Sequence, residues 1–466
     1  MLPRLGARIA SVFRATAPDP FVLAILLSAL TFFLAWAHMG VTAPNASALV
    51  NAWQSGLWDL LAFAMQMCLI LVLGHALAST KPVSFLLQSL VNIPSTARQA
   101  VWLTATTAIA FALLNWGLGL IVGAVLARNM QAALARRAAS GHPHCHVPQG
   151  LLPAAGYLGL MCWHGGFSGS APLAAADPDA LSKLLGPTLY ARVGGPIPIS
   201  QTLLTPTNLL ISGGLLLFTP LLLSLLCPRN TPPNSPLPEP PPPPPPLPLD
   251  PTDKPGRLPH FLEHSPLIPL LLVIPMSFFL LSQFRAKGWN ALDLNTVNLT
   301  LLTLGLALHT STSRYAAAVD DAARGCAAIL VQFPLYAGII AMLKFSGLIT
   351  LLSNEFVSLS NSNPPALRVL ILLSAAIVNL FVPSGGGQWA VQGPIAIQAA
   401  LDAGADPGRL VLCVAYGDQL TNMIQPFWAL PLLAITRARA RDIVGYTAIA
   451  MLFALLWCAL CLFFII

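Results

Sequence analysis

The chain has 466 residues, of which 56% are hydrophobic and only 8% are charged. Soluble domains carry roughly 25% charged residues, so the composition excludes an ordinary soluble protein and indicates a polytopic helical membrane protein. The net charge of +7 comes from Lys and Arg in loops. This is typical of loops that face the cytoplasm and does not indicate a surface for nucleic acid.

The chain begins with three arginines and a long apolar segment. The start, MLPRLGARIASVFRATAPDP, precedes an apolar stretch that is too long for a signal peptide and lacks a convincing cleavage site. We therefore expect a first span over 21–39 with a cytoplasmic N-terminus, and a second span over 57–78. The loop 40–56 has no Lys or Arg and suits the outside. Lys81 and the short amphipathic segment 83–92 suit the cytoplasmic interface.

The next apolar stretch carries a polar break, NWGLG at 115–119, between Arg98 and Arg128. Because both arginines favour the cytoplasmic side, two complete spans joined by almost no loop fit this pattern poorly. We predict a re-entrant hairpin over about 98–128 with its tip at NWGLG.

Two more spans complete an N-terminal half over 1–228. The first, at about 150–176, crosses outward and is interrupted by WHGGFSGSAP, and 202–226 returns inward. A Pro-rich segment follows, and such a segment forms neither helix nor strand. We predict a cytoplasmic linker over 229–260, with a P-x-x-P ligand for a partner as the alternative.

The second half, 261–466, contains five expected spans, a short interfacial segment at 347–360 and a second hairpin at about 366–401. The hairpin is broken by FVPSGGGQWAVQGP at 381–394, where three glycines and two prolines oppose a continuous helix. The expected spans are 266–284, 292–308, 326–345, 409–436, which is interrupted by GDQLTNMIQP, and 443–466, which ends outside the cytoplasm.

Both halves therefore contain the same parts in the same order: an interfacial helix, a broken hairpin, a broken span and a closing span. Two spans precede this set in the first half and three in the second, so the second set is inverted. Broken segments in corresponding positions of inverted halves indicate the substrate site of a transporter. The predicted fold is an all-α polytopic membrane protein. It is an inverted-repeat secondary transporter with about nine spans, two re-entrant hairpins and broken helices.

The broken segments also resemble a known family. LLNWGLGLIVGAVLAR (113–128), GYLGLMCWHGGFSGSAPL (156–173), FVPSGGGQWAVQGP (381–394) and YGDQLTNMIQPFWALPLL (416–433) resemble bacterial short-chain fatty acid transporters. The resemblance runs through almost the whole chain except the Pro-rich linker. It implies uptake of small monocarboxylates such as acetoacetate or butyrate. It also implies a place among ion-coupled carboxylate carriers of the ion transporter superfamily, with paired hairpins and elevator-type movement.

Hydroxyl, amide and backbone N–H groups beside the breaks are the candidate contacts for a substrate carboxylate. The alternatives are helix capping for the polar residues, a tight packing corner for the glycines and a satisfied core position for the histidine. The candidate substrate-binding residues are Asn115, Gly117, Gly119, His164, Ser168, Gly169, Ser170, Ser384, Gly385, Gly386, Gly387, Gln388, Thr421 and Asn422.

Close helix packing and apolar contacts are expected near the same breaks. Gly119 and Gly123 form a G-x-x-x-G pattern, which usually marks only close packing. Trp116 and Trp389 are candidate platforms for the apolar tail of a substrate, with packing tryptophans as the alternative.

Asp418 is the candidate ion-coupling residue, because an acid within an apolar span is costly and usually functional. It would bind Na⁺ with Asn422 and carbonyl oxygens, or carry a coupling proton. A partner for a backbone amide is the structural alternative. Few basic residues lie near these motifs, so a substrate anion would meet helix dipoles and amides. This favours a monocarboxylate over a dicarboxylate.

Two other functional classes fit less well. A channel needs a continuous polar path, and an enzyme needs a nucleophile–base arrangement, for which no recognised motif is present. No cofactor or metal is expected, since HPHCH at 142–146 lacks a second ligand group at structural-zinc spacing. Expected partners are the monocarboxylate and the lipid bilayer of a bacterial inner membrane, without nucleic acid, and a homodimer stays open.

Overall fold

The computed structural model describes residues 2–142, 144–228, 256–288 and 293–464, and all regular secondary structure within them is helical. Most of the predicted Pro-rich linker lies outside these residues. Helix α12 (Arg257–His264) begins before the predicted end of the linker at 260.

Eight helical segments of the described residues are long and apolar enough to cross a membrane, which makes the chain a multi-pass membrane protein. They are α2 (Pro20–Met39), α4 (Leu61–Ala78), α6 (Ala97–Leu114), α7 (Trp116–Ala139), α11 (Pro206–Leu226), Arg257–Ala286 with α13 (Leu267–Lys287), Thr312–Ser346 with α15 (Thr312–Ala323) and α16 (Ala327–Ser346), and α22 (Ala440–Phe464).

This set differs from the nine predicted spans for a physical reason. The prediction combines α6 and α7 into one hairpin, yet each helix has the length and hydropathy of a span. The interrupted spans at 150–176 and 409–436 are absent from the eight, because non-helical backbone divides each into short pieces. A further predicted span corresponds to α14 (Leu294–His309), which has only 16 residues.

The helix is broken at the tip of each of the two predicted hairpins. Asn115, in extended backbone, separates α6 from α7 and caps α7 by accepting from the N–H of Leu118. Ser384 caps α19 (Gly385–Asp402) in the same way after α18 (Pro364–Asn379). Asn and Ser are favoured at such positions because their side-chain oxygens satisfy free N–H groups of the first turn.

Two longer interruptions consist of short helical pieces. The first runs through α8 (Leu151–Tyr157), the 3₁₀ turns η1 (Leu158–Met161) and η2 (Trp163–Gly165), and α9 (Ser170–Ala176). The second runs through α20 (Pro407–Thr421), η6 (Asn422–Ile424) and α21 (Pro426–Thr436). Backbone groups freed by such interruptions need other partners inside the protein.

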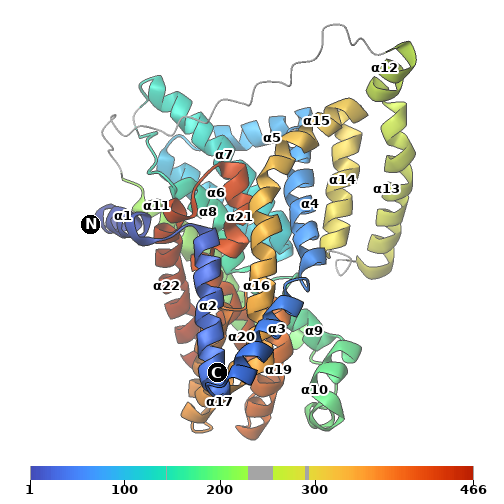
Figure 1. Cartoon of the computed structure of the whole chain (residues 1–466). Helices are drawn as coiled ribbons and strands as arrows, with labels where there is room; N and C mark the ends of the chain where they lie inside the picture. The colour runs from blue at the N-terminus through green and yellow to red at the C-terminus, as the bar shows by residue number, and fades with distance from the viewer. Residues whose placement is uncertain (1, 143, 229–255, 289–292, 465–466) are drawn as a thin grey trace.

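The contacts between helices divide them into two packed groups, whose ribbons can be followed in Figure 1. The outer group consists of α2, α3 (Ala43–Gly56), α4, α13, α14, α15 and α16, and the 3₁₀ turn η5 (Arg324–Cys326) links α15 to α16. The core group consists of α6 to α9, α11 and α18 to α22. α4 and α16 of the outer group contact α21 of the core group, so the groups share an interface.

Small residues let the helices of the core group approach closely. A Cβ at Gly123 would collide with the carbonyl of Gly156 on α8, and one at Gly119 would lie 2.5 Å from the backbone of Ala112. The G-x-x-x-G pattern of α7 is therefore a packing feature, in line with the expectation.

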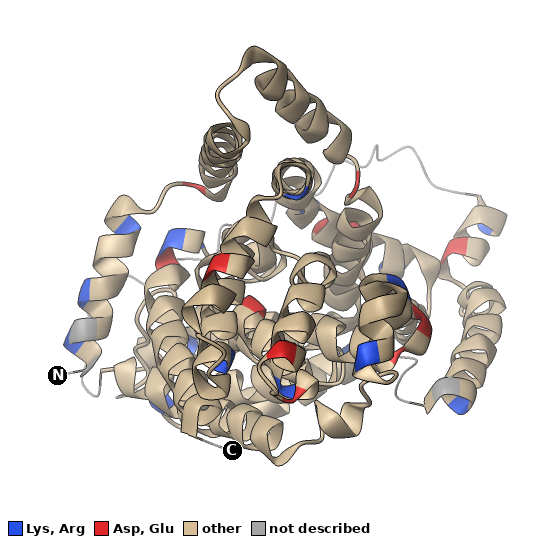
Figure 2. Cartoon of the chain, turned by 90° about the horizontal axis from the view of Figure 1, so that it is seen from below, with Lys and Arg blue, Asp and Glu red and all other residues tan. Residues whose placement is uncertain are grey.

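The remaining helices lie at the edges of the two groups. The expected interfacial segments are α5 (Lys81–Asn92) and α17 (Leu348–Leu359). α10 (Pro178–Val193) bends at Gly186, which has a φ of 71° before Pro187. The amphipathic helix α1 (Leu2–Thr16) packs on α22. Figure 2 shows how sparsely charged residues occur along the ribbon.

Candidate functional site

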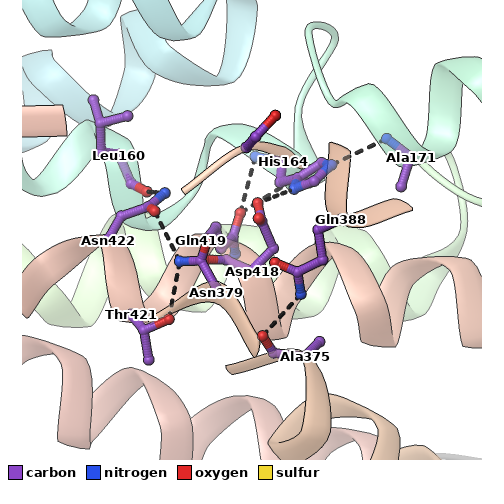
Figure 3. A network of polar contacts seen from close by, with 12 residues as sticks. Leu160, His164, Ala171, Ala375, Asn379, Gln388, Asp418, Gln419, Thr421 and Asn422 are labelled. Carbon is purple, nitrogen blue, oxygen red and sulfur yellow. Dashed lines mark hydrogen bonds and ion pairs between the residues drawn. The ribbon is translucent and has the colours of Figure 1, made fainter. Parts of the chain in front are cut away.

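His164 and Asp418 form a buried pair where the two interrupted helices meet (Figure 3). His164 Nδ1 lies 2.7 Å from Asp418 Oδ2, and His164 Nε2 accepts a hydrogen bond from the backbone N–H of Ala171 at 3.0 Å. Because an amide nitrogen only donates, Nε2 carries no proton. The imidazole is therefore neutral, with its proton on Nδ1, and donates to the carboxylate.

Gln419 fixes the backbone that presents His164. Its Oε1 accepts from the N–H groups of His164 at 2.9 Å and Gly165 at 3.3 Å. These bonds satisfy two donors that the helix interruption leaves free. Gln419 Nε2 is buried and has no hydrogen-bond partner among the described residues.

Asn379, at the end of α18, joins the second interruption to the α18–α19 break. Its Nδ2 lies 2.6 Å from the carbonyl of Asp418, 3.0 Å from Thr421 Oγ1 and 3.0 Å from Asn422 Oδ1. Gln425 in turn donates to the carbonyl of Asn379. The buried side-chain amide of Asn379 thus links α18 to α20 and to η6.

Thr421 and Asn422 hold the interrupted helix together. Thr421 donates to the carbonyl of Ala376 at 3.0 Å, and Asn422 donates to that of Leu160 at 3.3 Å. The hydroxyl of Tyr157 donates to the carbonyl of Asn422 at 2.9 Å. In this conformation both predicted ligands have partners within the protein.

Several buried oxygen atoms of this network have no hydrogen-bond partner. Asp418 Oδ1 is one of them, since only Oδ2 faces His164. Gln388 donates through Nε2 to the carbonyl of Ala375 at 2.8 Å, which leaves its Oε1 unpaired. Asn379 Oδ1 and Gln425 Oε1 likewise have no partner among the described residues. The centre of the core group is therefore rich in free oxygen acceptors.

The two glycines at the start of α19 have different surroundings. A Cβ at Gly385 would lie 2.9 Å from His164 Cε1, 2.9 Å from Trp163 Cη2 and 3.3 Å from Asp418 Oδ2. Gly386 is exposed, and a Cβ there would meet nothing within 4 Å. Gly385 thus touches the buried pair, whereas Gly386 faces open space at the tip. Gly387 donates to Ser384 in the cap.

The break between α6 and α7 docks on the segment that leads into α9. The N–H of Trp116 donates to Ser168 Oγ at 3.0 Å, and that of Phe167 donates to the carbonyl of Leu113 at 2.8 Å. A Cβ at Gly169 would collide with the carbonyl of His164. Ser168 and Gly169 therefore shape the backbone around His164, and Ser170 begins α9.

Other predicted site residues lie against neighbouring helices instead. Gly117 packs on Ile70 of α4 and Gly119 on Ala112 of α6. Trp389 is buried on α19 against Gly393. None of the three has a described hydrogen bond to the His164–Asp418 pair.

An aromatic cluster lies beside His164. Trp163 stacks on the imidazole with ring centroids 4.3 Å apart, and Trp116 lies 6.1 Å from Trp163 and 5.1 Å from Trp428. Phe63 of α4 completes the cluster at 5.8 Å from Trp428. The indole Nε1 of Trp163 is buried without a partner. The cluster bridges the outer and core groups.

Sequence reasoning missed Asn379, Gln419, Gln425 and Tyr157. An amide inside the apolar run before the glycine break was the available signal for Asn379, because isolated polar groups within a span need partners. Gln419 and Gln425 lie within GDQLTNMIQP itself. Nothing in the sequence assigns Tyr157 to the carbonyl of Asn422, which is far away along the chain.

Two solved transporter structures are similar to this chain over nearly its full length. Neisseria gonorrhoeae MtrF, described with a class of antimetabolite efflux pumps, aligns with a TM-score of 0.45 and 13% identity, covering 97% of each chain. The Alcanivorax borkumensis YdaH transporter, whose topology is described as unusual, aligns with a TM-score of 0.41 and 15% identity. This match covers 96% of the present chain and 98% of that one.

Closer relatives come from sequence. A protein of Escherichia coli (strain K12) is 39% identical over 438 residues, which is 94% of each chain. A protein of Haemophilus influenzae (strain ATCC 51907 / DSM 11121 / KW20 / Rd) is 37% identical over 459 residues, or 97% of each chain. Both are provisionally named short-chain fatty acid transporters. The family model for short chain fatty acid transporters matches residues 1–465. The chain therefore belongs to the short-chain fatty acid transporter family, a family of transporters and not of enzymes.

Proposed function

We propose that the protein carries short-chain monocarboxylates, such as acetoacetate or butyrate, across the bacterial inner membrane by cation-coupled alternating access. The substrate would bind where the helix interruptions converge, and Asp418 would hold the coupling cation. The two breaks and two interruptions would form the moving site, with re-entrant hairpins at 98–128 and 366–401 as its gates.

The observation that carries this proposal is the state of the Asp418 carboxylate. It is buried, and among the described residues its only side-chain partner is a neutral imidazole and its Oδ1 has no partner. A buried negative charge without a compensating positive charge is strongly disfavoured. Binding of one cation, H⁺ or Na⁺, would neutralise Asp418 and so favour the binding of an anionic substrate, and this mutual dependence would couple the two.

The free oxygens near Asp418 support a cation site. Na⁺, like other hard cations, prefers oxygen ligands, and Gln388 Oε1 and Asn379 Oδ1 are buried acceptors of the same network. A proton would instead reside on Asp418 Oδ1 itself. The neutral tautomer of His164 argues against the imidazole as the carrier, because the Ala171 N–H occupies its second nitrogen.

Complementary donors are available for the substrate carboxylate. Trp163 Nε1 and Gln419 Nε2 are buried N–H donors without partners among the described residues, and both residues contact His164. The first turn of α19 adds backbone N–H groups with the positive end of a helix dipole. None of these residues is Lys or Arg, so the site suits one carboxylate rather than two. The aromatic cluster would receive a short acyl chain.

Uptake by purified protein in proteoliposomes tests the function. Labelled acids of two to six carbons should accumulate saturably and exchange by counterflow, and accumulation should require a Na⁺ or proton gradient. Asp418→Asn is nearly isosteric and removes the charge. We expect it to abolish gradient-driven accumulation while exchange of substrate persists.

Asp179→Asn, at an exposed position in α10, is the matched control and should behave as the natural protein does. Accumulation by Asp418→Asn with an unchanged dependence on both gradients would remove Asp418 from the coupling mechanism. Flux that neither saturates nor shows counterflow would identify a channel instead.

A further inference from the structure

A polar cavity lies between the two helix groups, and neither His164 nor Asp418 lines it. It has a volume of about 220 Å³ and lies between α4, α7, α15, η5 and the end of α21. Its polar lining consists of Arg128, Arg324, Arg437, Asp321 and His75. A water molecule takes about 30 Å³ in the liquid, so the cavity has room for several waters or one small ligand. We refer to it as the arginine vestibule.

The charges of the arginine vestibule are unbalanced. Asp321 is the only carboxylate among the lining residues, and its Oδ2 lies 3.1 Å from His75 Nε2. Three guanidinium groups against one carboxylate leave an excess of two positive charges. Positive charges held in a cleft with low-dielectric walls focus their field and attract anions.

The cavity opens at the surface of the protein. Asp321, Arg324 and Arg437 are exposed, whereas Arg128 and His75 are partly buried. The vestibule thus combines an open mouth with two groups held deeper between α4 and α7. Guanidinium groups bind carboxylate and phosphate oxygens in planar, bidentate geometry.

The vestibule also lies on the helices that build the aromatic cluster. α4 carries Phe63 in the cluster and His75 in the vestibule, and α7 carries Trp116 and Arg128. Each pair is twelve residues apart, which is roughly 18 Å along a helix. Likewise, α21 carries Trp428 of the cluster near its start and reaches the vestibule at its end. The cavity therefore lies at the end of the interface that passes the candidate substrate site.

We propose that the arginine vestibule is a second binding site, for a small oxyanion that bridges the outer group and the core group. The ligand is a carboxylate or an inorganic phosphate, since both present oxygens to guanidinium groups. With a carboxylate, the site gathers the transported acid at the mouth of the pathway, and this version rests on the proposed function. With phosphate, the site is independent of transport.

Calorimetric titration of the full-length protein in nanodiscs, at low ionic strength, tests the site with inorganic phosphate and with butyrate separately. Arg324→Gln and Arg128→Gln should each weaken binding about tenfold, as expected for loss of one charged hydrogen-bonding partner. Asp321→Asn should strengthen binding several-fold, because it removes the one carboxylate that repels the anion. Arg314→Gln, at an exposed position of α15 outside the lining, is the matched control.

Weaker anion binding in the arginine variants together with stronger binding in Asp321→Asn supports the site. The anion that shows these effects, phosphate or butyrate, is the one that the site binds. A purely structural role for these residues predicts no gain of binding in Asp321→Asn. Titrations with both anions that are the same for Arg324→Gln, Asp321→Asn and the unmodified protein would overturn the proposal. Saturable butyrate uptake measured on the same samples would show that the transport proposal survives that result.

Discussion

Gly385 and Gly386 are neighbours at the tip of α19, yet the structure predicts different consequences for their substitution. A Cβ at Gly385 collides with His164 and Trp163, whereas one at Gly386 has open space. Neither residue has a positive φ, so side-chain volume alone decides the outcome.

Gly385→Val should therefore lose both stability and uptake. Overpacking a filled interior costs about 1–3 kcal/mol, which lowers the apparent melting temperature in detergent. Gly386→Val should melt within a few degrees of the natural protein. It should still lose uptake if the substrate approaches this backbone closely, because the added side chain blocks that approach.

Melting curves and uptake assays on the two variants check this pair. Normal transport by Gly386→Val would remove Gly386 from the substrate site and leave it as part of the cap. An unaltered melting temperature for Gly385→Val would contradict the contacts of Gly385 with the buried pair.

The tautomer of His164 is a second prediction at this scale. The Ala171 N–H and the Asp418 carboxylate together select the form with the proton on Nδ1. Nitrogen NMR of protein labelled in histidine should show this form for His164 near neutral pH, with His164→Gln as the assignment control. A protonated Nε2 would contradict the hydrogen-bond scheme and reopen His164 as a proton carrier.

At the scale of elements, the joint between α18 and the α20–α21 interruption depends on Asn379. Asn379→Ala would leave the carbonyl of Asp418 and Asn422 Oδ1 without this buried donor. Because each unpaired buried group costs about 1–3 kcal/mol, we expect the two groups together to cost roughly 2–6 kcal/mol of stability. Thermal unfolding in detergent measures it.

Asn51→Ala, at an exposed position of α3, makes the same change of side chain outside the joint and should be nearly neutral. Equal melting temperatures for the two variants would mean that Asn379 does not hold the interruption together. A selective loss in Asn379→Ala would explain why a buried amide ends α18.

At the scale of the whole molecule, the two ends of the chain should lie on opposite sides of the membrane. α1 lies beside the beginning of α22, where Arg14 Nε is 3.0 Å from Asp442 Oδ1. α22 then runs for 25 residues, or about 37 Å, which exceeds the roughly 30 Å of a hydrocarbon core. Three arginines of α1 favour the cytoplasm, so the C-terminus should be periplasmic.

Single cysteines at Arg8 and Phe464 test this arrangement with an impermeant maleimide on intact cells. All eight native cysteines are buried, so background labelling should be low. Phe464→Cys should react from outside, and Arg8→Cys only after permeabilisation. Reaction of both from the same side would refute the predicted topology and with it the inverted relation of the halves.

Local signals in the sequence were enough to determine the class of protein and the positions of the helix breaks. Few charges and long apolar runs predict a membrane protein, because uncompensated charge is excluded from hydrocarbon. Asn115, Ser384 and the glycines after it predict helix interruptions, since capping and backbone freedom depend on neighbours in the chain. The motif around Asp418 predicts a buried acid for the same local reason.

Only the tertiary structure decided which polar groups pair with one another. The partner of Asp418 is His164, 254 positions away, and Tyr157 reaches a carbonyl 265 positions away. Such pairings depend on how two interrupted helices cross, which no local pattern specifies. The same limit explains why Gly117 and Gly119 lie in helix packing although their motif resembles the α19 tip. Side-chain volume across the helix contact decides this difference, and it appears only once the neighbours, Ile70 and Ala112, are in place.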